Sequence, residues 1–404
     1  MIPPLEGIRV VDWTHVLAGP ACAYYLGLLG AEVIKVERPG RGDAIRHRGG
    51  TDRTRAEHAM STAYMTQAAG KQSLAVDLET KGGREVFERL LNSADVLIEN
   101  HRPDTLSRLD LTEDSTRAIN PRLVHCAMTG YGRGNDMAAA PAYDVNIQAI
   151  SGLMALTGTE ETGPLRTGAP VIDYATGMTA AMAVMAALMQ RARTGTGTFL
   201  DVSMLETAFA LMSSTITDFR LTGHAPKPRG NAANSRSPSS GTFACADGYI
   251  SLGVNEETQF RALARALDRA DWVSDPRFAD PVDRNRNGAE LGQAICDALS
   301  MRTAGEWEMV LMAAGVPCAK LRTLPEALEL APAQQRGFAS RGAAGFCGLP
   351  FSMGDEAGRR PSAPPPELGS GTRGVLVGLG YSDPEISGLS ASGAVDLGPS
   401  SLPG

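Results

Sequence analysis

The chain has 404 residues, of which 43% are hydrophobic and 21% are charged, so it is predicted to be a globular protein of two or three domains. Its 38 lysines and arginines and 45 aspartates and glutamates give a net charge of −7, which argues against nucleic acid or an anionic membrane as a partner. The six cysteines are scattered, without a CxxC motif or a Cys/His cluster, and the N-terminus has no apolar signal core. We therefore expect free thiols, no metal site and a cytoplasmic protein.

The first 130 residues alternate between apolar, strand-like runs and helical segments. Such alternation is typical of β-α-β units and predicts an α/β fold with a parallel sheet. Residues 14–20, THVLAGP, are predicted to form a loop. The predicted strands are 7–13, 31–37, 73–78, 95–100 and 123–130, and the predicted helices are 21–30, 81–94 and 112–120.

The second half of the chain predicts a further strand, several helices and a smaller α+β region. Residues 224–241 are rich in Pro, Ser, Asn and Gly and mark the best domain boundary. The most apolar stretch, 178–189, is too short to span a bilayer and predicts a buried helix. The expected elements are a helix followed by a loop within 144–160, helices at 176–194, 206–223, 256–269, 288–300 and 305–315, a strand within 194–204, a hairpin at 241–254 that turns at 246–248, an irregular segment at 349–374 and a short helix from 374.

A lone carboxylate, Asp173, lies in the stretch GAPVIDYATGMTAA (168–181), between an apolar run and small helix-forming residues. Asp173 can be a structural N-cap of the helix that follows. It can also be a nucleophile whose charge is stabilised at a helix N-terminus, where backbone N–H groups hold the oxyanion that forms when the carboxylate attacks an acyl group. The residues alone leave both interpretations open.

Basic residues recur near the ends of the predicted strands. Arg38 follows the second strand, Lys71 precedes the third, and Arg102 and Arg108 follow the fourth. Ligands of parallel sheets gather at the carboxyl ends of the strands, and arginine pairs well with phosphate oxygens. Each arginine alone is more often a solvated surface charge, but together they favour an anionic, phosphate-bearing ligand.

Two common enzyme classes lack their motifs in this chain. The turn after the first strand is not G-x-G-x-x-G, so nicotinamide binding rests on the β-α-β pattern alone. No G-x-S-x-G motif accompanies the six histidines, so a hydrolase triad is unsupported. Among the histidines, His15 in the first loop is the most consistent with a site.

Taken together, the motifs resemble the class III CoA-transferases, the family of formyl-CoA transferase and crotonobetainyl-CoA:carnitine CoA-transferase. The resemblance covers essentially the whole chain. It rests on residues 5–43 (LEGIRVVDWTHVLAGPACAYYLGLLGAEVIKVERPGRGD), 71–87, 94–111, 120–132, 141–152, 168–181 and 275–278.

The resemblance implies a fold and a mechanism. It implies an interlocked homodimer of chains with a Rossmann-like large domain, formed by residues 1–222 and a returning segment 326–404, and a small domain at 223–325. It places the nucleophile at Asp173, which would form an acyl anhydride and then an aspartyl-CoA thioester. Splitting a difficult transfer into easier covalent steps is the chemical advantage of such a nucleophile.

The resemblance also implies which residues bind coenzyme A, the acyl-CoA substrate or product. The matching positions are Arg38, Val76, Asp77, Leu78, Glu79, Asn100, His101, Arg102, Arg108, Ala140, Pro141, Ala142 and Tyr143. The chain departs from formyl-CoA transferase at Leu17, where that enzyme has Gln, at Glu79 and Pro141, where it has lysines, and in the loop 230–241, where it has a glycine run. These departures do not support specificity for formyl-CoA and oxalate.

We therefore expect a CoA-transferase that moves CoA from a donor such as succinyl-CoA to a small carboxylate or dicarboxylate. Arg46 or Arg48 is a candidate partner for a second carboxylate of the acceptor, and the other candidate substrate residues are His15, Leu17 and Asp144.

Two alternatives stay open. A related α-methylacyl-CoA racemase or epimerase needs two acid/base groups, but Tyr143 occupies the position of its histidine, while the acid of that motif is kept as Asp144. A non-catalytic CoA-ester-binding subunit is disfavoured by the intact Asp173.

Overall fold

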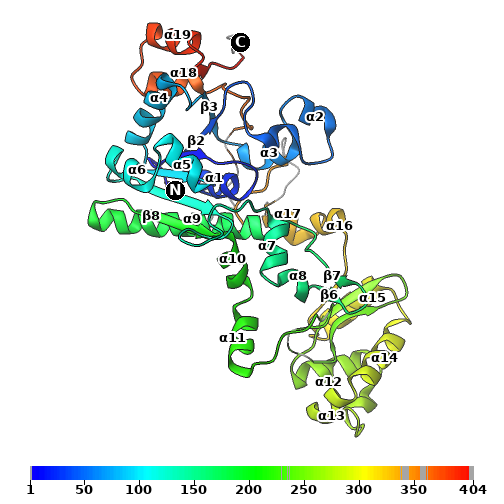
Figure 1. Cartoon of the computed structure of the whole chain (residues 1–404). Helices are drawn as coiled ribbons and strands as arrows, with labels where there is room; N and C mark the ends of the chain where they lie inside the picture. The colour runs from blue at the N-terminus through cyan, green and yellow to red at the C-terminus, as the bar shows by residue number, and fades with distance from the viewer. Residues whose placement is uncertain are drawn as a thin grey trace. The chain divides into compact units, whose positions relative to one another are not determined.

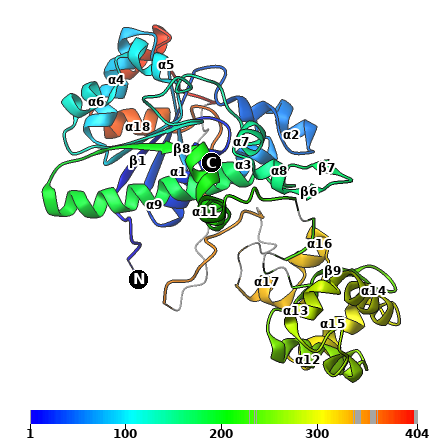
Figure 2. The ribbon, with the colours of Figure 1, turned by 60° about the horizontal axis from the view of Figure 1, so that its bottom comes forward.

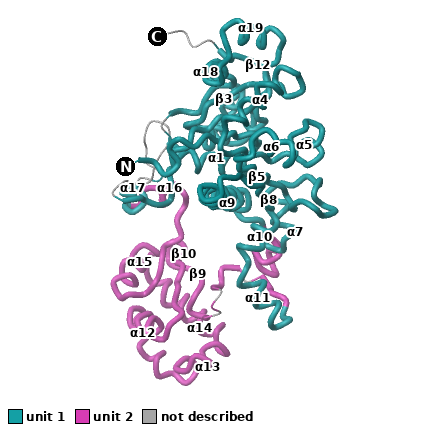
Figure 3. The backbone as a smooth tube through the Cα atoms, turned by 90° about the vertical axis from the view of Figure 1, so that its left-hand side faces the viewer, with its two compact units in different colours: residues 1–153, 166–224, 331–404 teal, residues 154–165, 225–330 magenta. Residues whose placement is uncertain are grey.

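The computed structural model describes residues 2–399, apart from 229, 234, 236, 337, 339–344, 355–360 and 362. The chain forms two compact units (Figure 3). The larger unit comprises residues 1–153, 166–224 and 331–404, and the smaller comprises 154–165 and 225–330. Residues 154–165 thus cluster with the smaller unit, whereas the sequence placed them in the large domain.

The larger unit is built on a seven-stranded sheet with the order β12-β3-β2-β1-β4-β5-β8. Six strands pair in parallel, and only β12 runs antiparallel to its neighbour β3. The predicted α/β fold with a parallel-dominated sheet is therefore confirmed. The strands are β1 Arg9–Trp13, β2 Glu32–Glu37, β3 Gln72–Val76, β4 Val96–Glu99, β5 Val124–Thr129, β8 Phe199–Ser203 and β12 Val395–Asp396.

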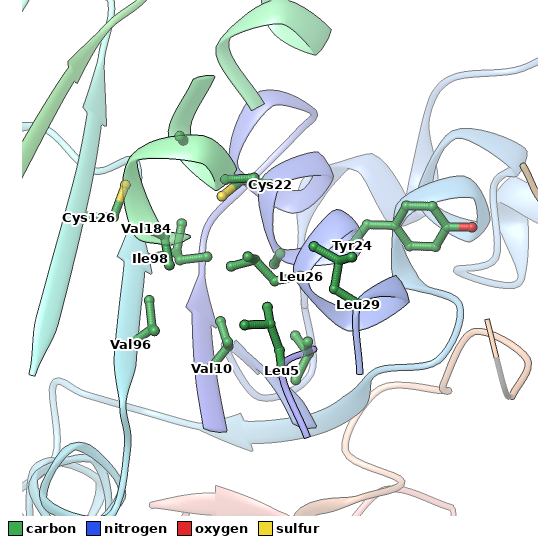
Figure 4. Close-up of a cluster of buried hydrophobic side chains, with 14 of the residues drawn as sticks. Leu5, Val10, Cys22, Tyr24, Leu26, Leu29, Val96, Ile98, Cys126 and Val184 are labelled. Carbon is green, nitrogen blue, oxygen red and sulfur yellow. The ribbon is translucent and has the colours of Figure 1, made fainter. Parts of the chain in front are cut away.

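Helices cover both faces of this sheet because successive strand residues point to opposite sides. On one face, Val10 and Ile98 pack with Leu26 of α1 and Val184 of α9 (Figure 4). On the other face, Val11 packs in a second core to which α4, α5, α18 and α19 contribute. The helices of this unit are η1 Ala44–His47, α1 Ala18–Leu28, α2 Arg53–Glu57, α3 Thr62–Ala68, α4 Lys81–Asn92, α5 Pro103–Leu109, α6 Glu113–Ile119, α7 Asp144–Ile150, α9 Val171–Thr194, α10 Met204–Leu211, α11 Ser213–Thr222, α17 Ala331–Arg336, α18 Thr372–Gly378 and α19 Asp383–Ala391. The short helix α8 Leu153–Leu156 starts at the last residue of this unit's first segment.

Helix α9 is the long helix that lies beside α1 under the sheet in Figures 1 and 2. One stripe of it is buried at helical spacing, including Thr176, Ala180 and Val184. The opposite stripe is exposed, and Met182 is 63% exposed. The prediction of a buried helix at 178–189 thus holds for one face only. By length and composition α9 could cross a membrane, but core helices of soluble proteins pass the same test.

The smaller unit contains the predicted hairpin. Strands β9 Ser240–Ala244 and β10 Tyr249–Gly253 pair antiparallel, and β11 Cys318–Lys320 adds a third strand. Its core gathers Phe260, Trp272 and Trp307 with neighbouring aliphatic residues. The remaining elements are β6 Gly158–Thr159, β7 Gly163–Pro164, η2 Ala270–Val273, α12 Glu257–Ala266, α13 Pro281–Arg286, α14 Gly288–Leu299, α15 Ala304–Ala313 and α16 Leu324–Leu328. Of the loop 230–241, residues 234 and 236 lie outside the described residues.

The strand order of the large sheet reverses at β1, because the chain adds β2 and β3 on one side of β1 and β4 and β5 on the other. The loops that leave the carboxyl ends of β1 and β4 therefore lie side by side. Asn100 after β4 accepts a hydrogen bond from the His15 N–H (2.8 Å) and donates one to the His15 carbonyl (2.9 Å). Ligands of open α/β sheets bind at such a reversal point.

Candidate active site

Asp173 lies inside the first turn of α9, which begins at Val171, five residues earlier than the predicted helix. The side chain that caps this helix comes from Asp144. Its Oδ2 atom accepts hydrogen bonds from the backbone N–H groups of Ile172 (2.8 Å) and Asp173 (3.1 Å). The interpretation of Asp173 as the N-cap is therefore wrong.

The other N–H groups at this end of α9 are also occupied. The Val171 N–H donates to the Ala169 carbonyl at 2.8 Å, and the Tyr174 N–H donates to the Pro170 carbonyl at 3.2 Å. The expectation that the first turn of α9 holds an oxyanion is therefore wrong as well, because its N–H groups already have acceptors.

Asp144 is itself held by a buried hydrogen-bond network. It is the first residue of α7, and its Oδ1 atom accepts from Gln148 Nε2 at 2.5 Å. Gln148 in turn accepts from the Thr167 N–H (2.9 Å) and donates to the Thr167 hydroxyl (3.0 Å). The network therefore fixes the segment before α9 and the start of α9 to α7.

Burial raises the pKa of Asp173 from 3.8 to about 7, and the charge of Asp144 adds to this shift. Near neutral pH the Asp173 carboxyl therefore carries a proton in a large share of molecules. Once deprotonated it is more basic, and hence more nucleophilic, than an ordinary aspartate. Such perturbed groups in a cavity are characteristic of functional sites.

Asp173 lines a cavity of about 260 Å³ at the ends of β1, β4 and β5. This cavity brings together many of the residues that the sequence singled out. They are His15, Leu17, Asn100, His101, Arg102, Ala140, Pro141, Ala142, Tyr143 and Asp173.

Most of the remaining candidates line a second cavity of about 180 Å³. They are Arg38, Val76, Asp77, Leu78, Glu79 and Arg108. His15 and His101 line both cavities. The predicted CoA-binding residues thus form two adjacent groups that meet at these two histidines.

The two histidines contact each other and the end of β1. His15 Nε2 lies 3.4 Å from His101 Nδ1, and the His101 ring stacks on Trp13 with 3.8 Å between ring centroids. Burial lowers the pKa of both imidazoles, and that of His101 falls to about 3. Both rings are therefore neutral near neutral pH and offer hydrogen bonds rather than charge.

Two arginines, Arg38 and Arg108, line the second cavity. Arg108 Nη1 lies 2.5 Å from Glu79 Oε1, and this hydrogen bond lowers the pKa of Glu79. Arg38 and Arg84 act on the same carboxylate. Glu79, which departs from the family pattern, thus sits as a counter-ion among arginines.

Three basic candidates lie outside both cavities. Arg46 is fully buried and binds Glu37 through Nε and Nη2, each at 2.7 Å, so its charge is already compensated. Arg48 is exposed and lines neither cavity. Lys71 is buried against Asp12 at 2.7 Å and belongs to the core rather than to a phosphate site.

The sequence analysis missed two features of the site. Val16 adopts φ = 66°, a conformation that β-branched residues rarely adopt, and it lines the Asp173 cavity. Trp13, which ends β1, forms the platform for His101. An aromatic residue at the carboxyl end of an inner strand is a signal that could have revealed Trp13. Among the described residues, no group of three or more His, Cys, Asp or Glu is placed to hold a metal ion.

The comparisons with known proteins agree with one another. The model of the family "CoA-transferase family III" matches residues 5–372. The chain is 32% identical to succinyl-CoA:glutarate CoA-transferase of Mus musculus, over 97% of this chain and 90% of that protein. It is 33% identical to acetyl-CoA:oxalate CoA-transferase of Acetobacter aceti, over 89% of this chain and 92% of that protein.

Among solved structures, a CAIB/BAIF family protein from Brucella suis is similar, with a TM-score of 0.83 and 30% identity. The match covers 93% of this chain and 99% of that one. Family model, sequence relatives and fold thus point to the same kind of enzyme, and the chain belongs to CoA-transferase family III.

Proposed function

We propose that this enzyme transfers CoA from an acyl-CoA donor, such as succinyl-CoA, to a small carboxylate or dicarboxylate, with Asp173 as the nucleophile. The observation that carries the proposal is the Asp173 carboxyl, which lines a cavity adjacent to the one lined by Arg38 and Arg108. Relatives with the printed names succinyl-CoA:glutarate, acetyl-CoA:oxalate and succinyl-CoA–D-citramalate CoA-transferase support this choice of substrates.

In the first half of the reaction, an Asp173 carboxylate oxygen attacks the thioester carbonyl of the donor. The carbon–sulfur bond breaks, CoA leaves as a thiolate, and Asp173 carries a mixed anhydride. The thiolate then attacks the Asp173 carbonyl and expels the donor acid, which leaves an aspartyl-CoA thioester.

The second half repeats these steps in reverse order with the acceptor. The acceptor carboxylate attacks the aspartyl thioester, which releases the CoA thiolate and forms a second anhydride. The thiolate then attacks the acceptor's carbonyl carbon, so acyl-CoA forms and Asp173 returns as a carboxylate. No proton, oxidant or metal ion is consumed in the sequence.

The tetrahedral intermediates need hydrogen-bond donors from somewhere other than α9. Leu17 and Ala18 line the Asp173 cavity at the start of α1. The first N–H groups of a helix have no acceptor within that helix. We infer that these backbone groups stabilise the oxyanion, since donors placed where charge develops contribute strongly to such reactions.

The two cavities suit the two ends of an acyl-CoA. Arg38 and Arg108 at the second cavity would pair with CoA phosphates. The neutral His15 and His101 between the cavities would hydrogen-bond the amide-bearing arm that leads to the thioester. The thioester would then lie beside Asp173.

The exposed methionine stripe of α9 supports a homodimer. Met178, Met182 and Met189 are 47–63% exposed on one helix face. A contiguous apolar face on a soluble protein marks an interaction surface, and a second copy of the chain is the partner we propose.

A turnover assay tests the proposed activity. The enzyme is incubated in deuterated water with pairs of acyl-CoA donors and free acids, and the masses of the CoA esters are measured by mass spectrometry. We expect a new CoA ester that forms only with the acceptor present and that keeps its α-hydrogen. Asp173→Asn should give no product. The control Asp52→Asn, which changes the N-cap aspartate of α2, should keep full activity. Deuterium at the α-carbon without CoA transfer would instead indicate racemisation.

A further inference from the structure

Two carboxylates meet at the start of α9. A helix N-terminus normally stabilises a nearby carboxylate through its free N–H groups. Here the Ile172 and Asp173 N–H groups are bound by Asp144, so the carboxylate that they stabilise is that of Asp144. Asp173 is the third residue of α9, and its own carboxylate has a like charge close by.

The other groups near Asp173 do not compensate for this charge. His15 and His101 in the same cavity are neutral near neutral pH. Tyr143 and Tyr174 carry no positive charge, and Arg102 lines the cavity but lies 3.5 Å from Asp104. Within the part of the chain that the structure describes, Asp144 is the one charged group that shifts the pKa of Asp173.

We propose that Asp144 is a positioning residue: it occupies the first-turn N–H groups of α9 and so leaves the neighbouring Asp173 carboxylate without these donors, as the reactive carboxylate of the two. The role of Asp173 in this inference rests on the proposed function. The electrostatic effect of Asp144 on Asp173 does not, and it can be measured without any substrate.

Two effects follow from this arrangement. A more basic carboxylate attacks a thioester faster once it is ionised, but a smaller fraction is ionised at a given pH. The two effects balance best when the group titrates near the working pH. The value of about 7 for the pKa of Asp173 meets that condition.

The variant Asp144→Asn removes the charge and keeps one oxygen as a cap. In the native protein the Gln148 amide donates a hydrogen bond to Asp144 Oδ1. In the variant, the new side-chain amide at position 144 can place its NH₂ group against that of Gln148, so that two donors face each other. The double variant Asp144→Asn/Gln148→Glu restores an acceptor for that amide and for the Thr167 N–H, with the negative charge one side chain farther from Asp173. The matched control is Asp52→Asn, the same substitution at the cap of α2.

The experiment is a pH titration of the Asp173 carboxyl by infrared difference spectroscopy on the unliganded protein, with Asp173→Asn as the reference. We expect a midpoint near 7 in the native protein and with Asp52→Asn. We expect Asp144→Asn and the double variant to lower the midpoint by about one pH unit or more, a tenfold change in the dissociation constant of the proton.

An ordinary midpoint in the native protein, or an unchanged midpoint in both Asp144 variants, would overturn the inference. A second readout is the rate of adduct formation with succinyl-CoA at each pH. In Asp144→Asn, the rise of this rate with pH should begin at a lower pH, in step with the lowered titration midpoint of Asp173. The maximal rate at high pH should fall several-fold. A shifted titration without any adduct in the native protein would contradict the proposed function and leave the role of Asp144 intact.

Discussion

At the scale of single residues, three buried ion pairs of the larger unit contrast with Asp173, which lies beside a second carboxylate, Asp144. Lys71 with Asp12, Lys35 with Asp43 (3.2 Å) and Arg46 with Glu37 are pairs in which each side chain is at most 1% exposed. Asp173 has a like-charged neighbour instead. The pairs hold the loops around the cavities, whereas Asp173 is available for chemistry.

The first prediction concerns the cost of Asp173 to the fold. Because its pKa rises from 3.8 to about 7, the folded state holds the proton more tightly than the unfolded chain, and this group's contribution to stability falls as pH rises between these values. Asp173→Asn removes that penalty. We expect it to raise the free energy of unfolding by about 1–3 kcal/mol at pH 8 and by much less at pH 4.

Urea unfolding at the two pH values measures this difference. Asp52→Asn, at an exposed helix cap, should show no such gain at pH 8. Equal stability of Asp173→Asn and the native protein at pH 8 would show that Asp173 carries no buried charge.

The second prediction separates two neighbouring arginines. Arg46→Ala leaves the Glu37 charge buried without its guanidinium partner, and we expect a loss of about 3–5 kcal/mol in the free energy of unfolding. Arg48→Ala, at an exposed position, should change it by less than about 0.5 kcal/mol. Chemical denaturation of both variants checks the contrast. A stable Arg46→Ala with a raised KM for the acceptor would instead restore the substrate role suggested by the sequence.

At the scale of elements, the site depends on how closely α9 packs on α1. Gly177 lies one turn after Asp173, and a Cβ atom there would approach the Ala18 carbonyl oxygen to 2.8 Å and the Ala21 Cβ to 3.1 Å. The absence of a side chain therefore sets the spacing between Asp173 and the start of α1.

The third prediction follows from this contact. Gly177→Ala should destabilise the protein by about 1–3 kcal/mol, since backbone must move, although alanine favours helix. It should also lower kcat by about tenfold or more, because Asp173 moves relative to α1. The control Gly388→Ala in α19, where a Cβ meets nothing within 4 Å, should gain about 0.5–1 kcal/mol. Thermal unfolding and the transfer assay test both variants, and equal behaviour would refute the close-packing argument.

Local sequence patterns predicted every strand of the large sheet except β12, and many of the helices around it, because apolar runs and helix ends depend on adjacent residues. They failed at both helix starts of the site. Ala18-Gly19-Pro20 was predicted as loop, although proline is tolerated in a first helical turn. The start of α9 was missed because its cap, Asp144, lies 28 residues earlier in the chain.

Side-chain roles were harder to predict than elements. Arg46 and Lys71 are buried in ion pairs and therefore do not bind a ligand. Their partners, Glu37 and Asp12, can be identified only once the strands are assembled. The resemblance to a family located the cavity residues, since it encodes three-dimensional neighbours that a single sequence does not show.

At the scale of the whole molecule, the exposed face of α9 gives the fourth prediction. If two copies meet there, Met182→Glu should place charges in the interface and reduce the solution mass from twice 42.5 kDa toward 42.5 kDa. Light scattering after size-exclusion chromatography measures this mass. Met301→Glu, at a 79% exposed position of the smaller unit, is the matched control and should not change it. A native protein that is monomeric would refute the proposed dimer.

The central claim is that Asp173 carries the acyl group and then CoA. In the most direct test, the enzyme is incubated with acyl-CoA donors, succinyl-CoA first, and the covalent Asp173 intermediates are trapped with hydroxylamine or borohydride. The masses of the intact and the trypsin-digested protein are then measured by mass spectrometry. We predict a mass change confined to peptide 167–191, which contains Asp173 as its one carboxylate side chain, and no change in Asp173→Asn. No adduct with any donor, together with solvent deuterium at the α-carbon of the CoA ester, would contradict the account and make Asp173 a proton-transfer group.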